Sequence, residues 1–212
     1  MAEAAILRVR HCGADIFCRR APPCCPACGC PLRNAGLGAA PVRLPSPFRH
    51  GHHQPRAFLL RPTVGSFLGG YDGKSDLHVG ITTSNGVVYN YNEEGVQRAE
   101  TGWEQCLSIP LVQPDMFGLL QQWDQLLDEF SVGEAWLPHR YEEHDHNCYT
   151  YALAFINSVL TAQGKQQMSK LEFTEKFVIP QTKKASKYMT LHQELTANDV
   201  YIVPLPGQEK QC

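Results

Sequence analysis

Six of the nine cysteines in this chain fall between Cys12 and Cys30, so a short N-terminal segment must accommodate an unusual number of thiols. A segment this short needs a staple to fold, and a bound metal ion can supply one. Cys25 and Cys28 have two residues between them, the spacing of half a zinc knuckle, and Gly29 permits the tight turn that follows. The sequence therefore predicts a cysteine-rich segment, residues 1–33, that holds a structural zinc ion.

The other half of this zinc site is less regular. Cys12 and Cys18 have five residues between them, where zinc ribbons usually have about two. The predicted ligands are Cys12, Cys18, Cys25 and Cys28, and the side chains that can substitute for them are His11, Cys24, Cys30, His50, His52 and His53. The alternative is a loosely ordered segment of reduced thiols. Disulfides are not expected, since no secretory signal is recognisable.

Charge and composition divide the rest of the chain. Residues 1–56 hold eight basic and two acidic side chains, a net charge of +6, whereas residues 57–212 hold eleven and nineteen, a net charge of −8. Residues 34–57 are rich in proline, glycine and small side chains, which predicts a linker, and residues 58–212 form the main domain. The basic residues are scattered and not interleaved with aromatic ones, so a nucleic-acid partner is not favoured.

Hydropathy gives an expectation about the compartment. No apolar run approaches the roughly 18–20 residues that a membrane-spanning helix needs. The first residues, MAEAAILRVRHC, lack the apolar stretch of a signal peptide. Hydrophobic residues make up 43% of the chain, which is enough for a core. We therefore expect a soluble intracellular protein, in the cytoplasm or the nucleus, with no transmembrane segment.

Residues 77–91 give the clearest structural signal. β-Branched and aromatic residues stand on both sides of Asn85-Gly86, which predicts a hairpin. The elements predicted after it are a strand at 106–111, a helix after Pro114, a helix over 148–163, a short helix capped by Ser169 and Glu172 and stopped by Pro180, a helix over 183–196 and a last strand at 199–205. This order predicts an α+β domain in which an antiparallel sheet packs against helices.

Cys148 is the residue that best combines position with chemistry. It opens the helix over 148–163, directly after Asn147, a natural N-cap. A thiol there lies at the positive end of the helix dipole beside unpaired N–H groups, so we expect its pKa to fall. The same N–H groups can donate to a developing oxyanion, and His78, on the polar face of the hairpin strand, is the candidate base. The alternative is a structural cysteine packed in the core.

Two segments resemble the circularly permuted papain-like families, which include the PPPDE thiol isopeptidases and the lecithin-retinol-acyltransferase-like enzymes. They read HVGITTSNGVVYN and HNCYTYALAFIN. In those families a strand histidine precedes a cysteine that opens a helix, usually within an Asn-Cys pair. Here the histidine is His78, the pair is Asn147-Cys148, and the separation of 70 residues is typical of the PPPDE type. The resemblance covers residues 58–165.

This resemblance implies an NlpC/P60-like fold and a Cys-His thiol hydrolase of the isopeptidase type, with a protein partner or a ubiquitin-like substrate. In the acyltransferase-like type a third polar residue follows the histidine by twelve positions, which here is Asn90, and it would orient the imidazole. Tyr149-Thr150-Tyr151 depart from the short polar stretch usual after the cysteine. No apolar anchor is present, which argues against a lipid substrate. The alternative is a catalytically inactive scaffold that serves as an interaction module.

Residues 75–98 and 135–157 are also similar to a protein found in vertebrates. That similarity implies no particular chemistry.

Overall fold

The structure, a computed structural model, describes residues 5–32, 39–113 and 115–206 and divides the chain into two compact units. We call Met1–Ser46 together with Ser186–Cys212 the head, and Pro47–Ala185 the body. The head is larger than the predicted cysteine-rich segment because both terminal parts of the chain contribute to it. The predicted boundary at residues 33 and 34 lies outside the described residues.

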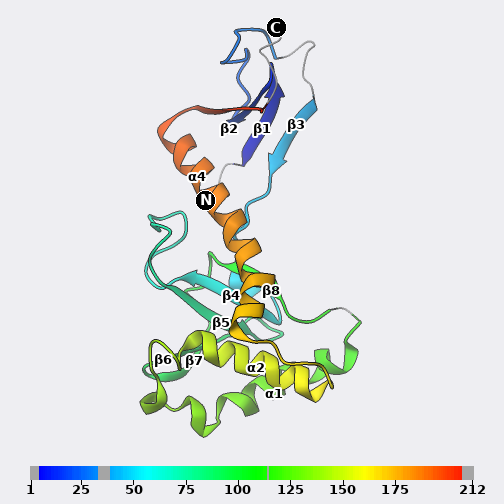
Figure 1. Ribbon diagram of the computed structural model, residues 1–212, viewed down its shortest axis with the longest axis vertical. Helices are drawn as coiled ribbons and strands as arrows, with labels where there is room; N and C mark the ends of the chain where they lie inside the picture. The colour runs from blue at the N-terminus through cyan, green and yellow to red at the C-terminus, as the bar shows by residue number, and fades with distance from the viewer. Residues whose placement is uncertain (1–4, 33–38, 114, 207–212) are drawn as a thin grey trace. The chain divides into compact units, whose positions relative to one another are not determined.

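The head contains a four-stranded antiparallel sheet in the order β3-β1-β2-β9 (Figure 1). Its strands are β1 (Ile6–His11), β2 (Ala14–Cys18), β3 (Ala39–Leu44) and β9 (Val200–Pro204). A two-residue turn joins β1 to β2, and both of its residues, Cys12 and Gly13, have positive φ, 39° and 73°. The core of the head is a small apolar cluster of Val9, Ile16, Cys18, Cys25 and Leu32.

β3 and β9 differ from the sequence prediction. β3 lies inside the predicted linker, 34–57, and pairs with β1. Residues from Pro47 onward belong to the body, where the Gly51 N–H donates to the Trp103 carbonyl at 2.7 Å. The segment predicted as a last strand is one, but it pairs with β2 in the head and not with the main domain. The residues of a strand favour extended backbone without specifying which sheet edge it joins.

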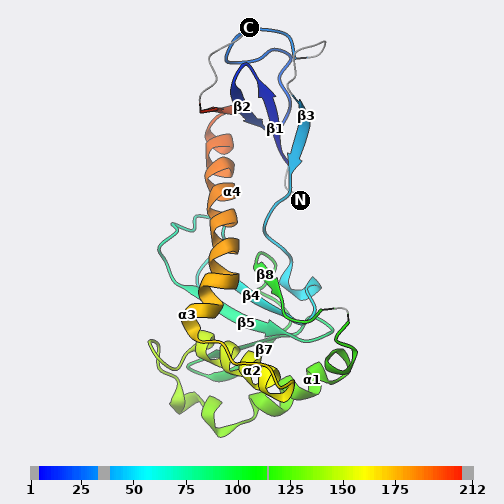
Figure 2. The same cartoon turned by 45° about the vertical axis from the view of Figure 1, so that its right-hand side comes forward.

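The body contains a five-stranded antiparallel sheet in the order β7-β6-β5-β4-β8. Its strands are β4 (Ala57–Pro62), β5 (Leu77–Thr82), β6 (Val88–Asn92), β7 (Gly95–Ala99) and β8 (Leu107–Pro110). Two long helices, α1 (Phe117–Ser131) and α2 (Cys148–Ala162), pack on it, and Figures 1 and 2 both show α2 lying across one face. Strands and helices are segregated, which confirms the predicted α+β class.

The predicted hairpin is β5 and β6, joined through Asn85 and Gly86. Gly86 has a φ of 89°, and a Cβ on it would lie 2.0 Å from the carbonyl oxygen of His52, so no larger residue fits this turn. The hairpin is tied to α1 by a hydrogen bond of 2.8 Å from the Trp123 indole to the carbonyl of Thr82. These contacts hold β5 and β6 in a defined position beneath the helices.

The end of the body confirms one prediction and corrects another. Ser169 and Glu172 form the predicted capping box at α3 (Lys170–Phe173). The predicted stop at Pro180 is wrong, since a π-helical turn, Thr174–Val178, leads directly into α4 (Ile179–Ala197). The π-helical turn lies directly before Pro180, and its wider register accommodates within a continuous helix a residue that lacks an N–H and would clash with the preceding turn of a regular α-helix. The remaining short elements are 3₁₀ turns at Gly51–His53, Glu134–Trp136 and Pro138–Arg140.

Candidate functional site

The hairpin brings His78 and Asn90 together. His78 lies on β5 and Asn90 on β6, and the imidazole Nε2 is 2.9 Å from the Asn90 side-chain oxygen. Because that oxygen can only accept, Nε2 carries the hydrogen and Nδ1 keeps its lone pair. The pair is part of the body's interior, with Asn90 buried and His78 half-buried. The ring is therefore held in one tautomer with a basic nitrogen available.

Asn147 and Cys148 form the start of α2 as the sequence predicts. The Asn147 side-chain oxygen accepts hydrogen bonds from the backbone N–H groups of Tyr149 and Thr150, at 3.0 and 3.2 Å. This is an N-cap, and it leaves the amide of Cys148, the first helical residue, unused by the cap. Cys148 itself is 8% exposed.

One cavity of about 550 Å³ brings these side chains together. Its walls include His78, Asn90 and Cys148, so all three predicted site residues face the same space. The other residues that line it are Arg61, Thr63, Asp76, Leu77, Asn92, Glu93, Tyr141, Glu143, His144 and Asn147. The chain thus places a thiol, an imidazole and its amide partner around a polar cavity wide enough for a peptide segment.

The strands part next to the thiol. β5 pairs with β6 at Ile81 and Thr82 and separates from it toward the start of β5.

Burial raises the pKa of the Cys148 thiol, and it outweighs the backbone N–H groups of Val79, Tyr149 and Cys148 itself, which lower that pKa. The predicted fall in pKa is therefore wrong in sign. The N–H groups at the helix N-terminus do stabilise the thiolate, as expected. The free energy of hydration that the thiolate loses on burial is larger than the stabilisation that the three amides supply.

Burial shifts His78 in the complementary direction. It lowers the pKa of the imidazole and outweighs the hydrogen bond to Asn90, which raises it. Both shifts favour a neutral thiol beside a neutral imidazole over an ion pair. Within the described residues no direct hydrogen bond joins the Cys148 sulfur to the imidazole.

Arg61 and Tyr141 are among the residues of the cavity that the sequence does not predict. Arg61, on β4, lies with its guanidinium 4.9 Å from the Trp103 ring and donates to the Gly102 carbonyl. Tyr141 has a pKa raised by burial and, to a smaller extent, by the neighbouring Cys148. Neither sits in a motif, and β4 is not among the predicted strands, so no local signal marks them.

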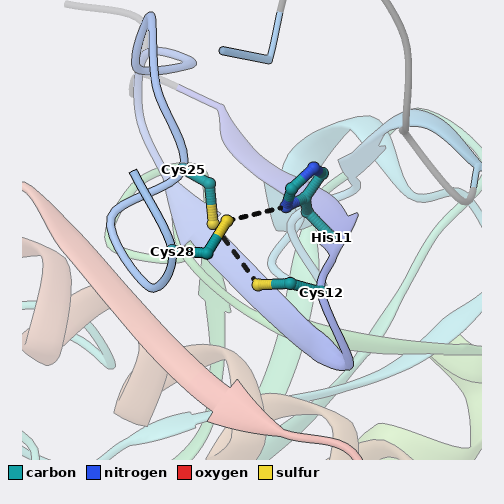
Figure 3. Close-up of side chains that lie close together, drawn as sticks. All are labelled: His11, Cys12, Cys25 and Cys28. Carbon is teal, nitrogen blue, oxygen red and sulfur yellow. Dashed lines mark hydrogen bonds between the residues drawn. The ribbon is translucent and has the colours of Figure 1, made fainter. Parts of the chain in front are cut away.

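A second group of reactive side chains lies in the head. His11, Cys12, Cys25 and Cys28 place one nitrogen and three sulfur atoms within 4.8 Å of one another, an arrangement that can hold a metal ion (Figure 3). The Cys12 and Cys25 sulfurs are 3.6 Å apart, and the Cys28 sulfur is 3.5 Å from His11 Nδ1. Burial and hydrogen bonds to the other two thiols raise the pKa of Cys12 to about 12.

Three of the four predicted metal ligands are in this group, and Cys18 is not. Cys12 lies in the turn at one end of the hairpin and Cys18 at the far end of β2, about 13 Å along the strand. Cys18 is fully buried in the apolar cluster, and His11, one of the predicted substitutes, takes its place. The other substitutes, Cys24, Cys30, His50, His52 and His53, lie outside the group.

The chain belongs to the DUF4796 family. The N-terminal part of that family matches residues 4–32, and the C-terminal part matches residues 41–195. The similarity to a vertebrate protein is also confirmed: the chain is 52% identical over 210 residues to the human MKRN2 opposite strand protein, covering 99% of this chain and 94% of that protein. No solved structure matches this chain.

A membrane-spanning helix is not found among the residues that the structure describes. None of their helices combines the length and the apolar character that crossing a bilayer requires.

Proposed function

We propose that the body is a thiol hydrolase of the permuted papain-like, NlpC/P60-like kind, with Cys148 as nucleophile, His78 as base and Asn90 as the residue that orients it. The observation that carries this proposal is the 2.9 Å bond between His78 Nε2 and Asn90, made in the same cavity that Cys148 faces. That bond fixes the tautomer in which Nδ1 can accept a proton. A packing role alone would not require an imidazole held in this way.

The chemistry begins from a neutral pair, since burial disfavours both charged forms. His78 Nδ1 takes the thiol proton as the Cys148 sulfur bonds to the carbonyl carbon of an amide, isopeptide or thioester. The carbonyl π electrons move to oxygen, and the backbone N–H of Cys148, which the N-cap leaves unused, stabilises the oxyanion. Collapse breaks the bond to the leaving group, which takes the proton from His78. Water then cleaves the acyl-enzyme by the same route.

The substrate in this proposal is a protein, and a ubiquitin-like modifier suits the isopeptidase likeness. The cavity is lined mainly by polar and charged side chains, among them Arg61, Asp76 and Glu93. Such walls suit a peptide with its many hydrogen-bonding groups better than an acyl chain. A reducing, intracellular compartment fits a chain that depends on thiols.

The second candidate function is a catalytically inactive interaction module on the same scaffold. The raised pKa of the Cys148 thiol favours it, because a reactive cysteine commonly has a depressed one. In that case the cavity would receive a partner's side chain, and Cys148 would be part of its wall.

The rate of Cys148 alkylation as a function of pH separates the two functions. Site-resolved mass spectrometry gives that rate in the wild type and in His78→Ala, with Cys106 as an internal control. Cys106 is fully buried and its pKa is raised by burial to about 12, so it reports opening of the fold. A hydrolase requires Cys148 to react faster than Cys106 near neutral pH and to slow in the variant. Equal rates, unaffected by the variant, would leave the interaction module.

For the head we propose a structural metal ion, zinc, with no part in the reaction. The four candidate ligands would fill every coordination position of a tetrahedral zinc ion, whereas catalytic zinc keeps one position open. The cluster and the cavity also belong to different units of the chain.

A further inference from the structure

We infer that His11 Nδ1 and the sulfurs of Cys12, Cys25 and Cys28 bind one Zn²⁺ as a Cys₃His site. This inference gives the ligand set of the structural ion proposed for the head and is independent of any chemistry at Cys148. His11 takes the place that spacing alone gives to Cys18. Figure 3 shows the four side chains converging from two segments, the end of β1 with the turn that follows it, and the loop that carries Cys25 and Cys28.

The distances match a tetrahedral zinc site closely. With zinc–sulfur bonds of about 2.3 Å and zinc–nitrogen bonds of about 2.0 Å, two sulfurs stand about 3.8 Å apart, and a sulfur and a nitrogen about 3.5 Å. The corresponding separations here are 3.6 Å for Cys12 and Cys25, and 3.5 Å for Cys28 and His11. The widest separation is within 4.8 Å, so an ion needs to draw the ligands in by only about 1 Å.

The backbone at Cys12 is a second, independent indication. Cys12 and Gly13 form a two-residue hairpin turn in which both residues have positive φ, a conformation that favours glycine and asparagine. A φ of 39° is a strained conformation for a cysteine, and it persists only where the surrounding structure holds the residue in place. The turn points the Cys12 sulfur at the Cys25 sulfur, so the strained residue is one of the four candidate metal ligands.

The loop that carries the other two sulfurs is built like a knuckle. The Gly29 N–H donates to the Cys25 carbonyl at 2.8 Å, and the Cys25 N–H donates to the Cys30 carbonyl at 2.7 Å. Gly29 has a φ of 78°, which lets the chain reverse directly after Cys28. Cys25 and Cys28 are thereby presented on one side of a tight turn, as two ligands of one ion.

Burial gives the physical reason for an ion. Cys25 is 1% exposed and His11 is 8% exposed, and Cys12 and Cys28 pack against the apolar cluster of the head. Thiols are weak hydrogen-bonding groups, so a shared ion would bind these four side chains more strongly than they bind one another. A disulfide does not account for Cys12 and Cys25, whose sulfurs are 3.6 Å apart where a bond needs about 2.05 Å. Three soft thiolates and one imidazole in a tetrahedral arrangement select zinc.

The ion would add a direct link between two parts of the head that also meet in its apolar cluster. It would fasten the β1–β2 turn to the loop that carries Cys25 and Cys28, beside the apolar cluster of Val9, Ile16, Cys18, Cys25 and Leu32. Val200, on β9, packs against the same cluster. A core this small needs a staple, and binding energy at such a site is folding energy.

The first experiment measures metal content in the full-length chain. Protein purified without chelator should contain one zinc per chain by elemental analysis. Metal-free protein titrated with Zn²⁺ at neutral pH should release about three protons, one per thiol. Titration with Co²⁺ should give the visible absorption of tetrahedral cobalt with thiolate charge-transfer bands. The inference is overturned if metal-free protein binds neither ion stoichiometrically. It is also overturned if protein freshly purified under reducing conditions contains a Cys12–Cys25 disulfide.

Variants then test the ligand set. Cys28→Ser should lose stoichiometric zinc, while Cys24→Ser, a matched change in the same loop, should retain it. His11→Ala should weaken zinc binding at least tenfold, while Cys18→Ala should leave the cobalt spectrum unchanged. The reverse order for His11 and Cys18 would return the site to the four-cysteine set and overturn the inference.

His11→Cys keeps the test decisive if other variants fail to fold. It should bind Co²⁺ with a spectrum shifted toward that of four thiolates, which only a true ligand position can produce. An unchanged spectrum in this variant contradicts the assignment of His11. Failure of zinc binding in every variant and in the wild type would still leave Cys148 alkylation measurable in the body, so the two proposals stand or fall separately.

Discussion

The cysteines of the head and the single cysteine of the body's cavity have very different neighbours. Cys12, Cys25 and Cys28 face one another and an imidazole nitrogen, whereas Cys148 faces backbone N–H groups in a cavity that also holds an imidazole. Groups that donate lone pairs gather around a cation, and groups that donate hydrogens gather around a developing anion. The same residue type therefore indicates metal binding in one unit and nucleophilic chemistry in the other, because its neighbours differ.

Removing the metal should produce the largest difference between the cysteines of the head and Cys148. A strong chelator should expose Cys12, Cys25 and Cys28 to alkylation more than tenfold faster, because bound zinc both shields thiolates and supplies about 10–16 kcal/mol to folding at such sites. Cys148 should keep its own rate in the same sample. Quantitative mass spectrometry of each cysteine checks both statements. An equal rise at Cys148 would show that the two units do not respond separately.

Changes to the imidazole should affect only the body. His78→Ala should slow acylation of Cys148 by an active-site-directed ester about 10²- to 10⁴-fold, the usual contribution of a general base. Asn90→Ala should cost less, about tenfold, because it loosens the ring without removing the base. Stopped-flow acylation with zinc content measured in parallel checks the separation. If Asn90→Ala is as severe as His78→Ala, Asn90 does more than orient the ring.

The stability of the body should depend on pH through His78. The pKa of His78 in the folded state is lowered, chiefly by burial, so the unfolded chain binds a proton at a higher pH than the folded chain does. The stabilisation is present above the ordinary histidine pKa of about 6.5 and is lost as pH falls through the folded value. Thermal melting between pH 5 and 8 should show this loss, and His78→Gln should flatten it. A wild type and a variant with parallel pH profiles would contradict the prediction.

The smallest expected effect concerns the strained turn. Cys12→Gly removes a ligand but relieves positive φ, so metal-free head should gain up to about 1 kcal/mol while zinc-loaded head should lose stability. The opposite signs in the two metal states are the test. Denaturation monitored by amide exchange in β1 and β2, with and without zinc, gives both numbers. A loss in both states would mean that Cys12 packs favourably by itself.

Local signals account for what the sequence predicts well. Asn85-Gly86 specifies the hairpin, and the hairpin places Asn90 against His78 without help from distant residues. The cap at Asn147 and the capping box at Ser169 are likewise set within a few residues. Each of these features is decided by backbone geometry and short-range hydrogen bonds.

What the sequence does not predict depends on long-range packing. The thiol of Cys148 has a raised pKa because the body buries it, and the residues next to Cys148 in the sequence do not predict that burial. His11 replaces Cys18 because β2 is an extended strand, which carries Cys18 away from the turn. The pairing of β9 with β2 joins residues more than 180 positions apart. Spacing rules assume a compact loop, so they fail where a strand intervenes.

That last pairing has a consequence for synthesis. β2 is finished early, but its partner β9 leaves the ribosome only after the whole of the body has been made. At about 5–20 residues per second, the edge of β2 waits roughly 10–40 seconds for its neighbour. An unpaired edge is a template for strands of other nascent chains. A hairpin and knuckle already clamped by an ion would pass that interval folded, so the supply of zinc during translation would influence how much of the protein reaches its final form.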